Sequence, residues 1–270
     1  MIRSRRWLPI LVLAPVLGPA SAGAAEITVN LRSRVEVFKG TSDWREVQVA
    51  QPLTVEKTAV VICDMWDRHW CSGATARVGG LVTRMEPFLE AARERGIQII
   101  HAPSETMDFY RDAPQRKLML GLEKVAPPAP LSLPDPPLPI DDKSGGCDTG
   151  DHFYKAWTRE NPGLRIDAAD VISDNGDEIY SFLRSRNIGT LLVMGVHTNM
   201  CVLNRSFAIK RMTALGIHCI LVRDLTDAMY NPQDPPHVSH DAGTGLMIEY
   251  IEKYWCPTTT RAELLRAFGR

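Results

Sequence analysis

The sequence alternates short, continuously apolar segments with amphipathic ones, and this alternation limits the fold more than any other feature. The apolar segments are TAVVICDM (58–65), IQIIHAP (97–103), TLLVMGV (190–196) and IHCILVRDL (217–225). Such runs are typical of strands that are buried on both faces. The segment 78–96, which ends at Gly96, has the spacing of an amphipathic helix. The pattern predicts an α/β fold, a three-layer sandwich in which helices cover both faces of a mainly parallel sheet.

Other segments extend this pattern. Residues 26–56 contain alternating stretches that predict an edge hairpin or a wrapping N-terminal β arm. Residues 169–173 predict a short strand, and residues 177–187 predict a helix. We expect a further helix from Cys201 to Leu215, and a last amphipathic helix, 239–255, that closes the sequence.

The segment 126–157 is an irregular excursion. Its first half contains so many prolines that helix and inner strand are both excluded. Its second half carries aromatic side chains, which favour an ordered loop over a disordered one: Phe153, Tyr154 and Trp157. We therefore predict a single domain, 57–270, in which the excursion forms part of a pocket wall.

The first 25 residues have the features of a cleaved export signal. Arginines near the start precede an apolar middle and the small-residue sequence ASAGAA. Arg5 and Arg6 partly match a twin-arginine signal, and the general secretory route is the alternative. A membrane anchor is less favoured, because the apolar stretch is shorter than the roughly 20 residues that a spanning helix needs. We expect the mature chain to be periplasmic or extracellular.

Charge gives no sign of a nucleic-acid partner. The formal net charge is −1, and removal of residues 1–25 takes away three arginines and no acid, which makes it −4. Domains that bind nucleic acid typically carry a basic surplus. We expect a small-molecule substrate as the partner and no stable membrane anchor. A homo-oligomer is left open, since the last amphipathic helix could serve a subunit interface.

The six cysteines do not have the spacing of a zinc site or of a small disulfide-stapled protein. Cys63 and Cys219 lie in strand-like apolar runs and are expected to be buried thiols. Cys71, Cys147 and Cys256 lie in loop-like sequence, where two of them could pair in an oxidising compartment. The sixth cysteine fits neither group.

Cys201 ends the stretch GVHTNMC (195–201), at the corner between a strand and a helix. The free backbone N–H groups and the dipole of a helix start favour a thiolate. Asp64 ends another buried strand, and the carboxyl ends of parallel strands meet at one edge of the sheet, so its carboxylate could accept the thiol proton. Position alone leaves three roles open for Cys201: a nucleophile, a redox or disulfide thiol, and a structural thiol.

Four stretches in this order resemble the isochorismatase-like cysteine hydrolases, which include nicotinamidases, carbamoyl-group amidohydrolases and isochorismatase. They are AVVICDMW, FLEAARERGIQIIHAP, GTLLVMGVHTNMCV and ALGIHCILVRDLTDAM. The resemblance covers roughly residues 57–250, without the proline-rich excursion. It implies a six-stranded parallel sheet, a catalytic set of Asp, Lys and Cys, and a cis peptide between Val196 and His197.

The resemblance places the catalytic acid at Asp64 and the nucleophile at Cys201. The lysine has no counterpart, because Ser173 or Asp174 stands at the end of the third strand, where relatives have it. The nearest upstream lysines, at 143 and 155, both lie in the excursion.

The resemblance also suggests substrate-binding residues. Those after the catalytic Asp are Trp66, His69 and Trp70, and those in the nucleophile turn are His197, Thr198 and Asn199. A packed loop around Trp66 is the alternative. Nicotinamidases bind a metal through an acid and histidines near the second strand, but the stretch HAPSETMDFY contains no Asp-x-His pair. We therefore predict no required metal and no other cofactor, with His101 as a core residue.

The leading hypothesis is an exported hydrolase that cleaves a small amide or related C–N bond through a cysteinyl acyl-enzyme. The first alternative is a catalytically silent relative that binds a small ligand in the same pocket. The second alternative treats Cys201 as a redox or disulfide thiol.

Overall fold

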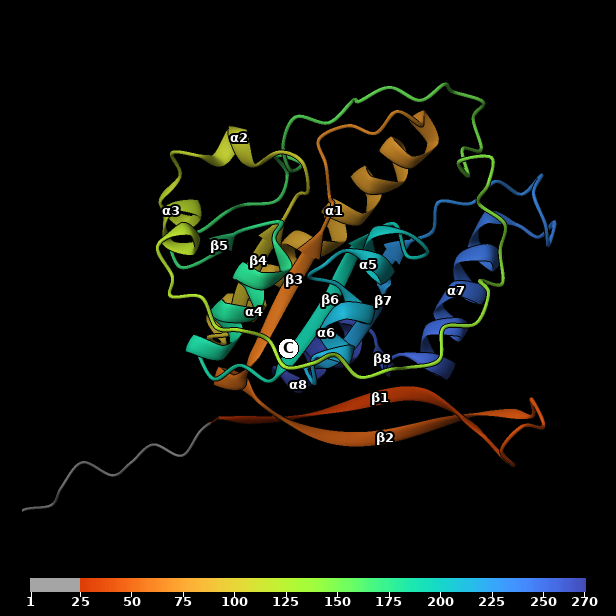
Figure 1. Ribbon diagram of the computed structural model, residues 1–270, viewed down its shortest axis with the longest axis horizontal. Helices are drawn as coiled ribbons and strands as arrows, with labels where there is room; N and C mark the ends of the chain where they lie inside the picture. Colours follow the sequence, from red (N-terminus) through yellow and green to blue (C-terminus); the bar gives the residue numbers. More distant parts are fainter. Residues whose placement is uncertain (1–24) are drawn as a thin grey trace, which may run out of the picture.

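The computed structural model describes residues 25–270. The predicted export signal lies outside the described residues, apart from its last one. In the described part of the chain, no helix is both long and apolar enough to cross a bilayer. Figure 1 shows a central sheet with helices on both sides and a long hairpin along one edge.

The sheet has eight strands in the order β2-β1-β8-β7-β6-β3-β4-β5. The last six in this order run parallel: β8 (Thr258–Thr259), β7 (His218–Asp227), β6 (Thr190–Val196), β3 (Thr58–Cys63), β4 (Gln98–Ala102) and β5 (Val171–Ile172). The other two, β1 (Glu26–Glu36) and β2 (Trp44–Thr54), form an antiparallel hairpin that joins the sheet through the pair Arg32–Thr258. The predicted α/β fold is confirmed, but the implied number of six strands is too low because the hairpin extends the sheet.

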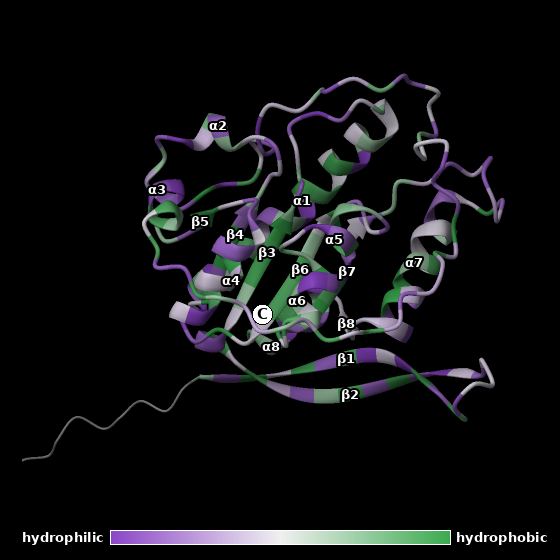
Figure 2. Cartoon of the chain, viewed as in Figure 1, coloured by the Kyte–Doolittle hydropathy of each residue, from purple (hydrophilic) through white to green (hydrophobic). Residues whose placement is uncertain are grey.

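Two apolar layers hold the helices on the sheet, and β3 contributes to both. Val60 and Ile62 face the layer under α1 (Ser72–Glu94) and α8 (Arg261–Ala267). The intervening Val61 belongs to the opposite layer, which packs under α4 (Gly176–Ser185), α6 (Ile209–Ala214) and α7 (His240–Tyr254). Figure 2 shows the inner strands as the most apolar part of the chain, as burial on both faces requires. The remaining α-helices of the described chain are short: α2 (Met107–Tyr110), α3 (Pro114–Leu120) and α5 (Cys201–Asn204).

Two sequence-based expectations about helices are wrong. The helix expected from Cys201 to Leu215 is two short helices, α5 and α6. The break falls at Arg205, whose backbone is extended (φ −58°, ψ 152°). It places the buried Phe207 against the core and lets the Ser206 hydroxyl accept a hydrogen bond of 3.0 Å from the Gly176 N–H. The second error is at the C-terminus, because β8 and α8 follow the helix that was expected to be the last element.

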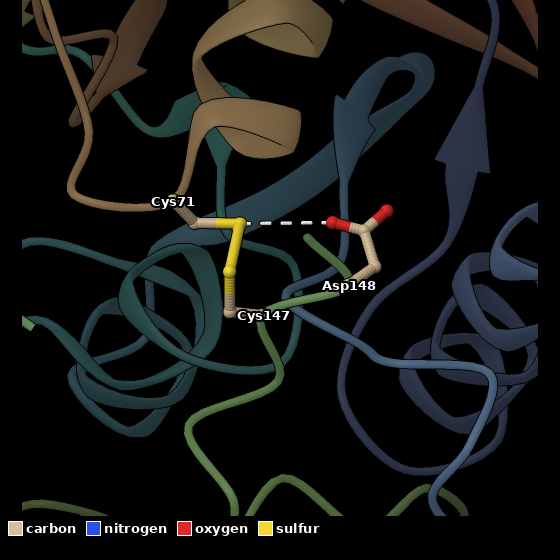
Figure 3. A group of neighbouring side chains, drawn as sticks. All are labelled: Cys71, Cys147 and Asp148. Atoms are coloured by element: carbon tan, nitrogen blue, oxygen red, sulfur yellow. Dashed lines mark hydrogen bonds between the residues drawn. A yellow bond between two sulfur atoms is a disulfide. The ribbon is translucent and has the colours of Figure 1, made fainter. Parts of the chain in front are cut away.

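A disulfide links the excursion to the start of α1. It joins Cys71 and Cys147, which are 76 residues apart in sequence and 5.7 Å apart between Cα atoms. Figure 3 shows Asp148 beside it, with Oδ1 3.6 Å from the Cys71 sulfur. Within residues 25–270, these three side chains form the one acidic or sulfur cluster with metal-ligand spacing. A metal binds thiolates, so the disulfide removes two of the three donors.

Candidate active site

Asp64 lies directly after β3 and is fully buried. Its φ of +49° is in the left-handed region, which Asp tolerates better than most residues. One carboxylate oxygen accepts a hydrogen bond of 2.7 Å from the Ser104 N–H, and the other accepts one of 2.9 Å from Arg205 Nε. Both oxygens are therefore held in fixed positions.

Cys201 begins α5 after the turn that follows β6. β6 pairs with β3 through Gly195 and Cys63, and a Cβ at position 195 would overlap the Cys63 carbonyl. Glycine therefore permits the two strand ends to approach, with φ of +113°. The cis peptide expected between Val196 and His197 is present. Asp64 and the turn to Cys201 follow these paired strand ends, and the charge of Asp64 acts on the Cys201 thiol, so the structure brings the two predicted residues together.

Arg205 is the cation beside this pair, and sequence reasoning missed it. Its Nε donates to Asp64, and its Nη2 lies 3.6 Å from Glu105 Oε1. The available signal was its position four residues after Cys201, which puts both side chains on one face of a helical turn.

The two upstream lysines of the excursion lie elsewhere. The Lys143 side chain is 90% exposed and pairs with Asp141. Lys155 Nζ donates to the Glu105 carbonyl at 3.2 Å and reaches Arg205 only through that residue.

Burial dominates the protonation of the pair. It raises the pKa of Asp64 above its usual value, although the charge of Arg205 and a hydrogen bond from Cys201 oppose it. Burial also raises the pKa of the Cys201 thiol, and the charge of Asp64 adds to this effect while Arg205 opposes it. The thiolate that the helix start was expected to favour is therefore not the resting state. α5 has only four residues, which is too short for a strong helix dipole.

A cavity of about 500 Å³ opens in front of Cys201. Its lining residues come from the excursion and from the turn and helix around the thiol: Leu138, Asp142, Asn199, Met200, Cys201, Asn204 and Arg205. A cavity of this size can hold a small organic molecule. Of the substrate-binding residues suggested by the resemblance, Asn199 lines it.

No protein-family model matches the sequence, and no curated protein matches it. Solved structures do match. A cysteine hydrolase from Pseudomonas syringae pv. phaseolicola superposes with a TM-score of 0.53 and 20% sequence identity, over 81% of this chain and 95% of that one. The chain shares the fold of this cysteine hydrolase.

Two further structures with lower scores are similar to it. An isochorismatase from Pseudomonas putida gives a TM-score of 0.48 at 15% identity, over 78% of this chain and 92% of that one. An isochorismatase family protein from Burkholderia thailandensis gives 0.47 at 16% identity, over 80% and 97%. At 20% identity, the likeness to the cysteine hydrolase from Pseudomonas syringae establishes the fold alone, and the function has to be argued from the site.

An aromatic side chain that follows Asp64 packs against the excursion. Trp66 stacks on Trp157 of the excursion, with ring centroids 4.3 Å apart and an interplanar angle of 9°. The Nε1 of Trp66 donates to the Ser104 carbonyl at 3.1 Å, and the N–H of Ser104 donates to Asp64. The stacked pair is therefore connected to Asp64 through Ser104. His69 and Trp70 line a separate hollow of about 370 Å³, which shares no lining residue with the cavity at Cys201.

The turn 197–199, which precedes Cys201, is almost completely buried. The Thr198 hydroxyl lies 2.7 Å from that of Thr226. Burial, with His69 nearby, lowers the pKa of His197 to about 3, so its imidazole is neutral. The Asn199 amide exchanges hydrogen bonds with the Met229 backbone at 2.8 and 3.1 Å and fixes the turn. The structure thus places Thr198 and His197 behind the cavity surface and Asn199 on it.

A second buried polar cluster holds the segment that follows the excursion against the sheet. His101, at the end of β4, has Nδ1 2.6 Å from Glu160 and Nε2 3.1 Å from Asp170. Burial by itself lowers the pKa of His101, but the two carboxylates outweigh it and raise the pKa to about 9. A doubly protonated imidazole therefore bridges two acids. The sequence predicted a core residue here and did not identify its ionic partners.

We expect this bridge to make stability depend on pH. The pKa of His101 rises from about 6.5 in the unfolded chain to about 9 in the folded one. Its contribution is therefore complete below about pH 6.5 and is lost as pH rises through 9. His101→Gln should lower the free energy of unfolding by about 3 kcal/mol at pH 6 and by much less at pH 10.

Urea unfolding of both proteins from pH 6 to pH 10 measures this difference. His152→Gln, at an exposed histidine of the excursion, is the matched control and should show no such trend. A stability difference between His101→Gln and the unsubstituted protein that stays constant with pH would contradict the assignment of a charged His101.

Proposed function

We propose that this protein is an exported hydrolase that cleaves a small amide or related C–N bond through Cys201 as nucleophile. The observation that carries the proposal is the arrangement of a thiol, a buried carboxylate and a guanidinium at one edge of the sheet, next to a cavity. Nucleophilic catalysis needs an adjacent base and a group that orients that base. Asp64 and Arg205 fill these two roles.

In the proposed reaction, Asp64 accepts the thiol proton as the Cys201 sulfur attacks the carbonyl carbon. The raised pKa of Asp64 suits a base that must also act as an acid near neutral pH. Asp64 then donates this proton to the leaving nitrogen as the C–N bond breaks, which leaves a thioester. A water molecule, deprotonated by Asp64, cleaves the thioester and releases the carboxylic acid and the free thiol.

Arg205 acts in this scheme as a fixed positive charge. A guanidinium stays protonated at all relevant pH values, so it orients Asp64 and stabilises negative charge without exchanging protons. It takes the place of the lysine that relatives carry on another element. The attacked oxygen would bind the N–H of Cys201, since the Met200 N–H already donates to the His197 carbonyl at 3.0 Å.

Export is part of the proposal. It is supported by the character of residues 1–25 and by the Cys71–Cys147 disulfide, because disulfides persist in oxidising compartments. N-terminal sequencing of native material tests it. Met1 intact on a cytoplasmic protein would remove this part.

Mass spectrometry of the intact protein, quenched during reaction with a panel of small primary amides, tests the reaction. The proposal requires an acyl adduct on the peptide that contains Cys201, together with released ammonia. A ligand-binding relative without activity would show saturable binding of an amide but neither adduct nor ammonia. A Cys201 that resists alkylation until a reductant is added would support the redox alternative.

A further inference from the structure

The cavity at Cys201 contains one carboxylate that the proposed reaction does not use. Asp142 comes from the excursion and is partly buried in the cavity wall. One of its oxygens, Oδ2, accepts a hydrogen bond of 2.9 Å from Asn199 Nδ2. Its other oxygen makes no hydrogen bond to the described part of the chain, so the side chain keeps acceptor capacity toward the cavity.

The charge of Asp142 has no partner in the described structure. Within residues 25–270, no Lys, Arg or His nitrogen lies within 4.0 Å of its carboxylate. Arg205, the cation of the same cavity, is already matched by Asp64 at 2.9 Å and by Glu105 at 3.6 Å. In the described part of the chain, Asp142 is therefore the charged side chain of the cavity lining that lacks an ion pair. A partly buried carboxylate without an ion pair can gain a charge-assisted hydrogen bond from a cationic group of a ligand.

The amide nitrogens of the two asparagines in the wall are occupied. Asn199 donates to Asp142 and Met229, and Asn204 donates to the backbone carbonyls of Asn199 and Met200 at 3.2 and 2.9 Å. The remaining lining side chains, Leu138 and Met200, are apolar. Asp142 is thus the group of the wall best placed to recognise a charged part of a substrate.

The backbone around Asp142 is held firmly in place. The backbone N–H of Asp141 donates to the Pro235 carbonyl at 2.9 Å. The backbone carbonyl of Asp142 accepts a hydrogen bond of 2.9 Å from the Gly145 N–H. The disulfide anchors the same segment at Cys147, five residues further on. A carboxylate fixed before binding costs less conformational entropy when it takes a ligand.

We propose that Asp142 determines specificity by binding a positively charged group of the substrate, so that the preferred substrates are small amides that also carry an ammonium or similar cation. This inference rests on the proposed function for the identity of the scissile bond. The cation would pair with Asp142 while the amide carbonyl lies at Cys201. Charge-assisted hydrogen bonds in a partly desolvated cavity are stronger than those between neutral groups.

Three primary amides of similar length test the proposal. They are 4-aminobutanamide, which ends in an ammonium, pentanamide, which ends in a methyl group, and succinamate, which ends in a carboxylate. We expect kcat/KM for 4-aminobutanamide to exceed that for pentanamide by about 10-fold or more, the factor expected from one such hydrogen bond. Asp142→Asn keeps an acceptor for Asn199 but removes the charge, and should abolish this ratio.

Asp141→Asn is the matched control. It removes the same charge one residue away, from a side chain that does not line the cavity at Cys201, and should leave the ratio unchanged. Asp142→Lys should shift the preference toward succinamate. An equal fall in kcat/KM for all three amides in Asp142→Asn would overturn the proposal, because a purely structural role acts on every substrate alike.

Calorimetric binding of the same amides to Cys201→Ala separates this inference from the proposed hydrolysis. One outcome is that 4-aminobutanamide binds in a way that depends on Asp142, while the unsubstituted protein does not hydrolyse it. This outcome would support the cation site and contradict the proposed function. Hydrolysis of the amides without any preference that depends on Asp142 would support the proposed function and contradict the cation site. The absence of such a preference in both assays overturns the cation site.

Discussion

Replacement of Cys201 by serine should lower turnover by about 10³-fold or more, the loss expected when a covalent nucleophile gives way to one that the same base activates poorly. Asp64→Asn should cost a comparable factor, because the amide cannot accept the thiol proton. The double variant should be little worse than either single one, since the two residues act as a unit. Steady-state kinetics with an amide that the protein hydrolyses provides the measurement.

Alkylation of Cys201 as a function of pH distinguishes loss of the base from loss of the fold. The charge of Asp64 helps to raise the pKa of the thiol, whereas Arg205 lowers it. Asp64→Asn should therefore lower the pKa of Cys201 and speed alkylation near neutral pH, while turnover falls. The other free thiols, Cys63, Cys219 and Cys256, are buried and should react slowly. Equal alkylation profiles in the two proteins, with the reactivity of free cysteine, would defeat the nucleophile assignment.

Arg205→Met should lower kcat/KM by about 10²-fold, or roughly 2.7 kcal/mol of transition-state stabilisation. Without the guanidinium, burial raises the pKa of Asp64 further, so less of the carboxylate is available as a base at pH 7. The acid limb of the pH profile of kcat/KM should therefore move to higher pH. A structural defect alone would lower activity without moving this limb.

Two further variants sharpen this test. Arg205→Lys keeps the charge but loses the planar donor geometry, and should recover part of the activity and return the acid limb toward its original position. Arg184→Met, at an exposed arginine of α4, is the control and should be neutral. If Arg205→Met retained full activity with an unshifted pH profile, another cation would have to replace the missing lysine.

Most of the fold could be predicted from the sequence because burial leaves a local pattern. The runs 58–65 and 190–196 became β3 and β6, since a strand covered on both faces needs apolar residues throughout. Their shared direction placed Asp64 and Cys201 at one edge of the sheet. The break between α5 and α6 could not be predicted, because no Gly or Pro marks it. It follows from long-range contacts, such as that between Ser206 and Gly176.

The candidate site, like the fold, could be predicted from the sequence only in part. The sequence by itself placed Asp64 and Cys201 at one edge of the sheet, because each follows a strand whose position the apolar pattern encodes. Only the tertiary structure decided that Arg205 lies beside Asp64, 141 residues away in sequence, and that Asp142 enters the cavity from the excursion. These contacts depend on how irregular segments fold back over the sheet. Such packing is set by many weak long-range interactions and leaves no periodic signal in the chain.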